Sequence, residues 1–495
     1  MDNFAFKKIP FAIASAQGLA RKDSQTVLAL YELYEKKLTR NLLRDRYYEM
    51  KQKPFDLGIS VPPHLKRLEQ VIGWAAKSVD SLANRSQFDG FVCEDENTLL
   101  TLQNICTRNN LKRKYRKAVR SELKHSCAFA AVTSTLDNHA QINVYPATAA
   151  AALWSDHLGR ISAGMVVVDR DNSARGEGCP IWIDVFTDEA IIEIRYINGG
   201  WVADYNYHGM GRCLMEALVH NATLDRPMGT SRISRAVMNI CDSAMRASVR
   251  SEISSEFFTS PQKYLLGADK EALEGKSKWD AYIGNIFAVS RSKTGEVPQF
   301  GQLSQGSMQP HIDYMRALAA RFSGETNIPI NELGIVSDNP SSAEAIYASK
   351  EALVIDAQNL NADNGEALQR IAQMALAVEQ KSDLETVQAQ TLNLQTKFKN
   401  PALPSIVSQA DAIVKQISAI PYIAESTVAL EQLGYNDEQI QRLLATKREN
   451  EANQLTNAIV NNKALEAQAQ VLQAQKQQNT QENEQKPFTG ENSDE

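Results

Sequence analysis

Two amphipathic stretches separated by a different kind of sequence decide the fold of this chain. The first, GTSRISRAVMNICDSAMRA at 229–247, repeats apolar residues at the 3.6-residue period of a helix with one packed face. The second, MQPHIDYMRALAARFSG at 308–324, uses a 4-3-4-3 spacing and ends at Gly324. The two stripes consist of Ile233, Val237, Ile240, Ala244 and Ala247, and of Met308, Ile312, Met315, Ala319 and Phe322. Together they predict a two-helix arm that holds the intervening segment away from the body.

The segment at the end of this arm, residues 259–307, is expected to form a small α/β unit. Residues 263–266 and 283–290 are typical of short strands, and Trp279 is the one large side chain available as a core anchor. The first helix is expected to open at Gly229-Thr230-Ser231 and to end before Ser260-Pro261.

A loop and a long helix are predicted after the arm. Pro329 and Gly334 exclude a continuous helix across 327–340, and this loop contains no Lys or Arg. Ser341 and Glu344 then form a capping box that opens a helix running to about 378. The Asn- and Gly-containing residues 361–365 are expected to kink or split it.

The flanking parts of the chain complete an α+β prediction. Amphipathic helices are expected at 24–50, 65–82 and 96–124. Strands of an antiparallel meander are expected at 161–169, 181–186, 190–197 and 200–205, with a hairpin turn at Asn198-Gly199. Helical segments are expected at 381–400, 406–420 and 424–433 and from Asn436 onward, and a disordered acidic tail at 476–495.

Composition bounds the class of protein. The 495 residues are 43% hydrophobic and 23% charged, which is typical of a globular chain with two to four domains. A net charge of −6 argues against a protein whose main task is to grip nucleic acid. No apolar run is long enough to cross a membrane, and the apolar core near the N-terminus is too short for a signal peptide. The six cysteines lack a C-x-x-C spacing, so we expect free thiols.

No constellation of residues predicts catalysis. The seven histidines include no H-E-x-x-H and no close pair. The turn His208-Gly-Met-Gly-Arg212 lacks the Lys-Ser/Thr of a P-loop and the third glycine of a dinucleotide fingerprint. We therefore expect no enzyme, and no catalytic, metal or cofactor site.

A basic segment is the strongest local charge signal. Six of the nine residues from Lys112 to Arg120 are basic. We interpret the segment as a solvated helix face, or as a surface for acidic neighbours in an assembly. The alternative interpretation is a face that contacts phosphates.

The order of these parts resembles the portal proteins of tailed bacteriophages, specifically the family of long-tailed phages, over about residues 30–450. The resemblance rests on short patterns taken together. They are Arg46-Tyr47-Tyr48 followed by a proline-rich turn and Trp74, the 208–212 turn, Gly229-Thr230-Ser231, Ile328-Pro329-Ile330 with Leu333-Gly334, Ser341-Ser342-Ala343-Glu344, Asn400-Pro401, Ala410-Asp411-Ala412, and Leu433-Gly434-Tyr435.

The resemblance implies a division of the chain. Residues 1–226 would form a wing of helices and an antiparallel sheet. Residues 227–258 and 308–326 would be the stem helices, 259–307 the clip and 327–340 the tunnel loop. A long wing helix at 341–379 and a crown at 380–475 would follow, ahead of the acidic tail.

The resemblance also implies a role and partners. Such proteins form a twelve-fold ring at one capsid vertex, through which double-stranded DNA is packaged by the terminase and later ejected. They are assembled in the host bacterial cytoplasm and carry no ATPase. Expected partners are other copies of the chain, DNA, the terminase large subunit, the major capsid and scaffolding proteins, and head-completion or adaptor proteins; no membrane is expected.

The same resemblance assigns candidate site residues. The loop residues expected to face DNA are Asn327, Ile328, Pro329, Ile330, Asn331, Glu332, Val336, Ser337, Asp338 and Asn339. Those expected at the stem, toward neighbours or the lumen, are Arg232, Arg235, Arg246, Arg250, Asp313, Arg316 and Arg321. Those expected to bind partners at the clip are Lys263, Tyr264, Lys276, Trp279, Arg291 and Lys293.

Two other hypotheses remain at this point. In the first of these, the chain is a non-portal scaffold protein of the virion or of another assembly, and its long helical tail binds partners. A nucleic-acid-processing enzyme using residues 112–120 is the third possibility, although no paired carboxylates or metal-ligand spacing accompany them.

Overall fold

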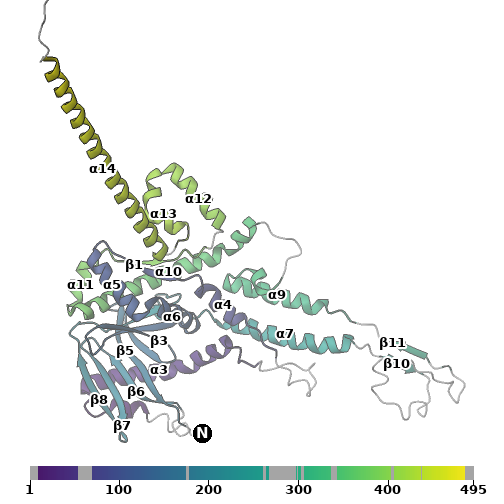
Figure 1. The fold of residues 1–495 in the computed structure, drawn as a ribbon. Coiled ribbons are helices and arrows are strands. Elements are labelled where there is room, and N and C mark those ends of the chain that lie inside the picture. Colours follow the sequence, from purple (N-terminus) through teal and green to yellow (C-terminus); the bar gives the residue numbers. More distant parts are fainter. Residues whose placement is uncertain are drawn as a thin grey trace, which may run out of the picture. The chain divides into compact units, whose positions relative to one another are not determined.

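The structure is a computed structural model that describes most of the chain. The described residues are 9–53, 70–173, 178–259, 263–266, 297, 299–302, 306–335, 343–402, 406–435 and 437–484. The chain divides into two compact units, Met1–Ala402 and Leu403–Glu495. The mixture of helices and antiparallel sheets agrees with the predicted α+β class (Figure 1).

A five-stranded antiparallel sheet forms one layer of the first unit. Its strands, in pairing order, are β4 (Ala150–Ser155), β5 (Arg160–Asp171), β6 (Cys179–Phe186), β7 (Ala190–Ile197) and β8 (Gly200–Tyr207). The four predicted strands are confirmed as β5–β8. The predicted hairpin is also confirmed, because Asn198 and Gly199 both have the positive φ that a two-residue I′ turn requires.

One face of this sheet is covered by the N-terminal helices α2 (Ile9–Ala14) and α3 (Arg21–Tyr48). Leu30 and Tyr34 of α3 are buried in a cluster with Met165 and Ile192 of the sheet. The alternation of strand side chains therefore supplies an apolar face, and the stripe of α3 covers it.

A second core lies around a three-stranded sheet with the order β3-β2-β9. These strands are β2 (Cys127–Ser134), β3 (Ala140–Pro146) and β9 (Met215–Val219). The helices α4 (Trp74–Ala83), α5 (Glu96–Asn109), α6 (Leu111–His125), α10 (Ala343–Gln380) and α11 (Leu384–Gln390) contribute to the same core. The strands β1 (Phe88–Val92) and β12 (Gln395–Phe398) form an antiparallel pair beside it.

Several predicted elements differ from those observed. The helix expected at 96–124 is two helices, because Asn110 between α5 and α6 adopts a left-handed conformation with φ 51°. The helix expected from residue 65 begins at Trp74; residues 54–69 lie outside the described part. Residues 381–400 form α11 and then the short strand β12 instead of one helix.

The long helix α10 is not split at 361–365. Asn364 is fully buried and donates its amide to the Glu122 carboxylate and the Tyr115 hydroxyl, both on α6. These tertiary contacts outweigh the low helix propensity of Asn and Gly in this short segment.

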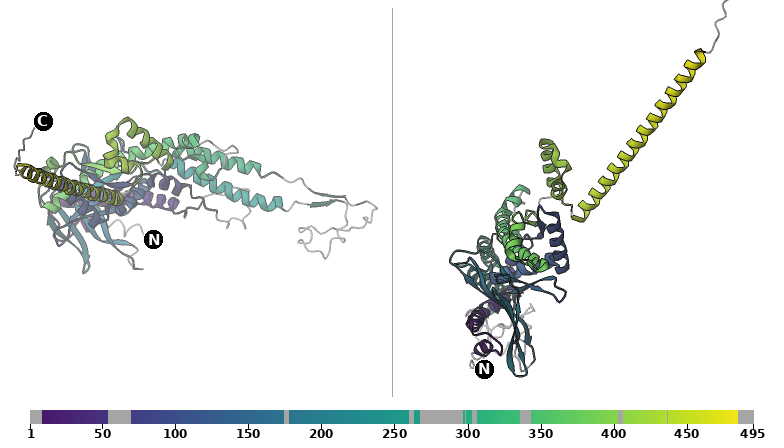
Figure 2. Two further views of the ribbon diagram at one scale, coloured as in Figure 1. Left: turned by 45° about the horizontal axis from the view of Figure 1, so that its top comes forward. Right: turned by 90° about the vertical axis from the view of Figure 1, so that its left-hand side faces the viewer.

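The two-helix arm is present. Figure 2 shows α7 (Arg235–Thr259) and α9 (Gln309–Thr326) side by side, extending from the core of the first unit. Beyond them, β10 (Lys263–Leu266) pairs with β11 (Gln299–Gln302). The second helix runs through Gly324 to Thr326, so the predicted end at Gly324 is two residues early.

The second unit is helical. It contains α12 (Ile406–Ala419), the 3-10 helix η4 (Pro421–Glu425), α13 (Thr427–Gln432) and α14 (Asp437–Glu484). The disorder expected from residue 476 is not found as far as Glu484, since α14 continues to that residue. Six of the nine residues from 476 to 484 are Lys, Gln or Glu, which are good helix formers. Residues 485–495 lie outside the described part. None of the helices in the described ranges is both long and apolar enough to cross a membrane.

Candidate functional site

The arm is anchored to the body by the apolar stripes of its helices. Val237 and Ile240 of α7 and Ala319 and Phe322 of α9 are buried. The Phe322 ring packs on Trp74 of α4, with ring centroids 5.4 Å apart. Farther from the body, Ile312 of the same predicted stripe is 46% exposed. The outer half of α9 therefore carries apolar surface that the described part of the subunit leaves exposed.

The segment that leads into α7 is held in place by backbone hydrogen bonds. The predicted helix start at 229–231 is wrong, because these residues bond to other elements. Gly229 has φ 63°, and the Thr230 amide donates to the His220 carbonyl at 3.0 Å. The Ser231 hydroxyl donates to carbonyls at the end of α6. Helix α7 begins only at Arg235.

Arg232, expected at a subunit interface or in the lumen, lies inside this subunit. Its side chain is only 9% exposed. The guanidinium donates to the carbonyls of Ser78 on α4 and Thr326 at the end of α9, and pairs with Asp356 of α10 at 3.4 Å. Arg232, which lies just before α7, thus joins the base of the arm at the start of α7 and the end of α9 to α4 and α10.

The loop expected to face DNA begins as a well-packed segment. Ile328 and Pro329 are buried, and Asn327, with φ 55°, donates to the Asp356 carboxylate at 3.0 Å. Among the next described residues, Ile330, Asn331 and Gly334 are exposed, whereas Glu332, Leu333 and Ile335 are partly buried. The four residues Val336, Ser337, Asp338 and Asn339 lie outside the described part.

Glu332 is the charged residue of the described part of this loop, and it is surrounded by cations. It lies in the short 3-10 helix η3 (Ile330–Leu333). Its carboxylate is 3.6 Å from the Lys77 ammonium, 3.7 Å from the Arg85 guanidinium and 3.9 Å from the Lys350 ammonium. The arrangement holds η3 against α4 and α10 and neutralises the negative charge of Glu332.

The other predicted stem residues, with the exception of Arg246, are exposed. Arg235 and Arg250 of α7 and Asp313, Arg316 and Arg321 of α9 are exposed. Arg246 is half-buried and donates to the Ser243 hydroxyl at 3.1 Å.

The end of the arm is described only in part. Tyr264 of β10 is exposed and pairs across the ladder with Gly301 of β11. The strand that pairs with 263–266 is β11, which the sequence did not single out, and the strand predicted at 283–290 lies outside the described part. Lys276, Trp279, Arg291 and Lys293 also lie outside it, as does the side chain of Lys263.

Lys112, Lys114 and Arg120 of the basic segment 112–120 form contacts within the subunit. Lys112 pairs with Asp89 at 3.1 Å and Arg120 with Asp80 at 3.0 Å. The Lys114 ammonium donates to the carbonyl of Ile142 and to Asn143 on β3. Arg113 and Arg116 remain exposed. The segment is thus a helix face that is partly bonded within the subunit and partly exposed; its roles toward acidic neighbours or phosphates stay predictions.

Metal-binding clusters and cysteine thiols can be checked among the described residues. Within them, no cluster of three His, Cys, Asp or Glu side chains could hold a metal ion. The six cysteines, all described, are free thiols. Burial raises the pKa of Cys127 to about 11 and that of Cys213 to about 12, so these thiols stay protonated at neutral pH.

A buried polar cluster escaped the sequence analysis. Glu122 is fully buried, and its Oε2 accepts from the Asn364 amide at 2.9 Å, while its Oε1 has no partner in the described part of the chain. Burial raises the pKa of Glu122 to about 8. The Tyr115 hydroxyl bonds to the same amide at 3.1 Å and to Ser86 at 2.6 Å. A signal existed, because Glu122 falls on the apolar stripe of α6, but the basic residues obscured it.

A family model named "Phage portal protein, SPP1 Gp6-like" matches residues 29–453. This range includes most of α3, the five-stranded and three-stranded sheets, the arm, η3, α10 and the second unit up to the first part of α14. The chain belongs to this phage portal protein family. The expected family resemblance is therefore confirmed.

Individual relatives agree with the family assignment. The "Portal protein" of Mycobacterium phage L5 is 24% identical over 385 residues, which cover 74% of this chain and 77% of that protein. The "Portal protein" of Mycobacterium phage D29 is 24% identical over 406 residues, covering 79% and 81%.

Solved structures with a related shape come from a gene transfer agent (GTA) particle. A chain from "Virion of native gene transfer agent (GTA) particle" has a TM-score of 0.44 at 12% identity, covering 77% of this chain and 89% of that one. A chain from "Neck of native GTA particle computed with C12 symmetry" has a TM-score of 0.43 at 12% identity, covering 82% and 92%. TM-scores below 0.5 add nothing to the family assignment, which rests on the family model.

Proposed function

We propose that this portal-family chain forms a closed ring at one capsid vertex, through which double-stranded DNA enters during packaging and leaves during ejection. The match to the portal family over residues 29–453 is the observation that carries the proposal. The ring has about twelve subunits, as the resemblance implies, related by heterologous interfaces. The chain itself has no enzymatic activity, and the terminase supplies the motor.

The observed elements fit the parts that such a ring needs. The first unit up to β9 forms the wing, α7 and α9 the stem, and residues 259–307 the clip. Residues 327–340 form the tunnel loop, α10 the long wing helix and 380–475 the crown. The clip docks the terminase and later head-completion proteins, and the wing contacts the major capsid and scaffolding proteins. These contacts place the protein in the virion after assembly in the bacterial cytoplasm.

The exposed surface of the arm supports contacts between the arms of neighbouring subunits, which would together form the wall of the channel. Arg250 of α7 and Arg316 and Arg321 of α9 are exposed on the arm, as are Ile312 and Tyr314 of α9. An exposed mixture of arginine and large apolar side chains is typical of protein interfaces. Neighbouring arms in a ring would cover this surface.

The charge of the loop supports passage of DNA without adhesion. Residues 327–340 contain no Lys or Arg, so the loop gains nothing from neutralising phosphates. Glu332 is already paired with Lys77, Arg85 and Lys350, so it adds little repulsion. The loop would thus guide the duplex by shape.

The experiment that tests the proposal is the assembly state of the purified chain. Mass photometry and negative-stain electron microscopy should show rings of about twelve subunits with a central hole wide enough for duplex DNA. A monomer or dimer at every protein concentration would overturn the proposal. Open or irregular assemblies would favour the alternative, a non-portal scaffold protein.

A further inference from the structure

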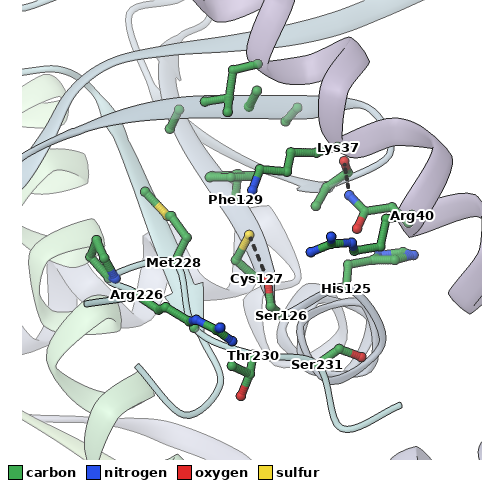
Figure 3. Close-up of a pocket in the computed structure, with 18 of the residues that line it drawn as sticks. Lys37, Arg40, His125, Ser126, Cys127, Phe129, Arg226, Met228, Thr230 and Ser231 are labelled. Atoms are coloured by element: carbon green, nitrogen blue, oxygen red, sulfur yellow. Dashed lines mark hydrogen bonds between the residues drawn. The ribbon is translucent and has the colours of Figure 1, made fainter. Parts of the chain in front are cut away.

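A cavity of about 800 Å³ lies beside the segment that leads into the arm (Figure 3). One wall is the second half of α3, and the floor is formed by β2 and β4. The opposite wall is the segment 225–231 with the first residues of α7. No part of the portal function described above uses this cavity.

The cavity is strongly cationic. Five cationic side chains line it, from α3 and from the opposite wall: Lys37, Arg40, Arg44, Arg226 and Arg235. Asp225 is the one acidic residue in the lining. None of the five cations forms an ion pair with a carboxylate in the described part of the chain. Arg235 is also the first residue of α7, so the positive end of that helix dipole lies at the same place.

The positive charge of Arg44 is only partly accessible to water. Its guanidinium is half-buried and donates to the His125 carbonyl at 3.0 Å, but its Nε has no partner among the described residues. Burial, and then the neighbouring Arg40, lower the pKa of Arg44 to about 10. A partly buried cation without a counter-ion destabilises the free subunit, and an arriving anionic group would relieve that cost.

The rest of the lining favours a protein as the source of the negative charge. Apolar side chains alternate with the cations: Leu33, Leu153, Trp154, Pro227 and Met228. Trp154 is 36% exposed. Tryptophan and arginine together are typical of the residues that dominate protein interfaces. A small inorganic anion would leave the apolar lining uncovered, and the convex backbone of duplex DNA does not fit a recessed cavity.

We propose that this cationic cavity receives an acidic segment of an adjacent copy of the same chain. The inference rests on the proposed ring. Each subunit carries a net charge of −6, so copies repel one another unless opposite charges meet at their contacts. A heterologous ring interface brings a different surface of the next subunit to each cavity. The carboxylates of that surface pair with Arg40, Arg44 and Arg226, and its apolar side chains cover Trp154.

The first test uses the unmodified protein and two adjacent lysines. Lys37 lines the cavity, whereas Lys36 is exposed on the same helix and does not. Acetylation of amines in free subunits and in rings is read by peptide mass spectrometry. We expect labelling of Lys37 to fall about tenfold in the ring, because interface groups are shielded from solvent, while labelling of Lys36 changes little. Equal labelling of Lys37 in both states would overturn the proposal.

The same samples identify the occupant. A water-soluble carbodiimide joins an amine to a carboxylate that it contacts, with loss of water. We expect rings, but not free subunits, to yield a cross-link between Lys37 and an aspartate or glutamate of another copy, shown by mixing isotopically light and heavy chains. Protection of Lys37 without any such inter-copy cross-link, but with saturable binding of pyrophosphate to the ring, would assign the cavity to a small anion and overturn the proposal.

A charge reversal provides the third measurement. Arg40→Glu should weaken assembly about 30-fold or more, measured by mass photometry on dilution, because it places like charges in contact. Arg116→Glu on α6 makes the same charge change away from the cavity and should assemble like the wild type. If the wild type forms no ring, the proposed function fails. If the wild type and Arg40→Glu form equally stable rings, only the inference about the cavity fails.

Discussion

The substitution Glu122→Gln should make the free subunit more stable at neutral and alkaline pH. Glu122 is fully buried, has one amide donor at 2.9 Å and has no cationic partner. A glutamine has the shape of the protonated glutamate and never carries its charge. The variant therefore keeps the contact with Asn364 and removes the cost of ionising a buried carboxyl.

The sign and size of the effect follow from proton linkage. The pKa of Glu122 rises from its ordinary 4.5 to about 8 in the folded chain, because burial disfavours the charged form. Below pH 4.5 the carboxyl of Glu122 is protonated in both the folded and the unfolded chain, so its full contribution to stability is present. As pH rises through this window the unfolded chain releases the proton while the folded chain retains it, so the free energy of unfolding falls by about 1.4 kcal/mol per pH unit. Above about 8 the loss reaches a plateau of a few kcal/mol.

Urea unfolding of the free subunit, followed by tryptophan fluorescence from about pH 5 to about pH 9, measures this difference. The advantage of Glu122→Gln over the wild type should grow across that range, because other titrating groups cancel in the comparison. Glu351→Gln is the matched control, since Glu351 is exposed on α10. A difference between Glu122→Gln and the wild type that is independent of pH would refute a neutral, buried Glu122.

Two further substitutions test how the arm is held. Arg232→Ala should destabilise the free subunit by about 3–5 kcal/mol, because it leaves the buried acceptors of Arg232 without a donor; Arg316→Ala, at an exposed position of the same arm, should change stability by no more than about 0.5 kcal/mol. Equal urea midpoints for the two variants would contradict the role given to Arg232. Gly229→Ala should cost about 3 kcal/mol or more, since a Cβ would lie 2.2 Å from the His220 carbonyl oxygen. Gly159→Ala has a similar positive φ but open space around it, and a loss equal to that of Gly229→Ala would show that the close approach is unimportant.

The sequence by itself determined the elements whose signal is local. The apolar period of α7 and α9, the β-branched runs of β5–β8 and the Asn198-Gly199 turn each depend on neighbouring residues only, and the structure contains them. The order of these elements was enough to indicate the portal family. The absence of Lys and Arg from residues 327–340 was equally plain in the sequence.

Other features were decided only by the tertiary structure. Arg232 and Ile328 lie in segments predicted to be a surface arm and a surface loop. In the structure Ile328 is buried and the Arg232 side chain is only 9% exposed. The central strand β2 is buried along most of its length, so its side chains do not alternate between apolar and polar, and a run of this kind is not distinguished from a helix by its period.

The sequence analysis missed the buried Glu122 and the cationic cavity because both depend on contacts between elements that are distant in sequence. Glu122 is neutral because α10 buries it, and the cationic cavity exists because α3 and the segment 225–231, nearly 200 residues apart in sequence, face each other. Periodicity reports which side of an element is apolar. It does not report which distant element will cover that side, and the energies of buried charges depend on that covering.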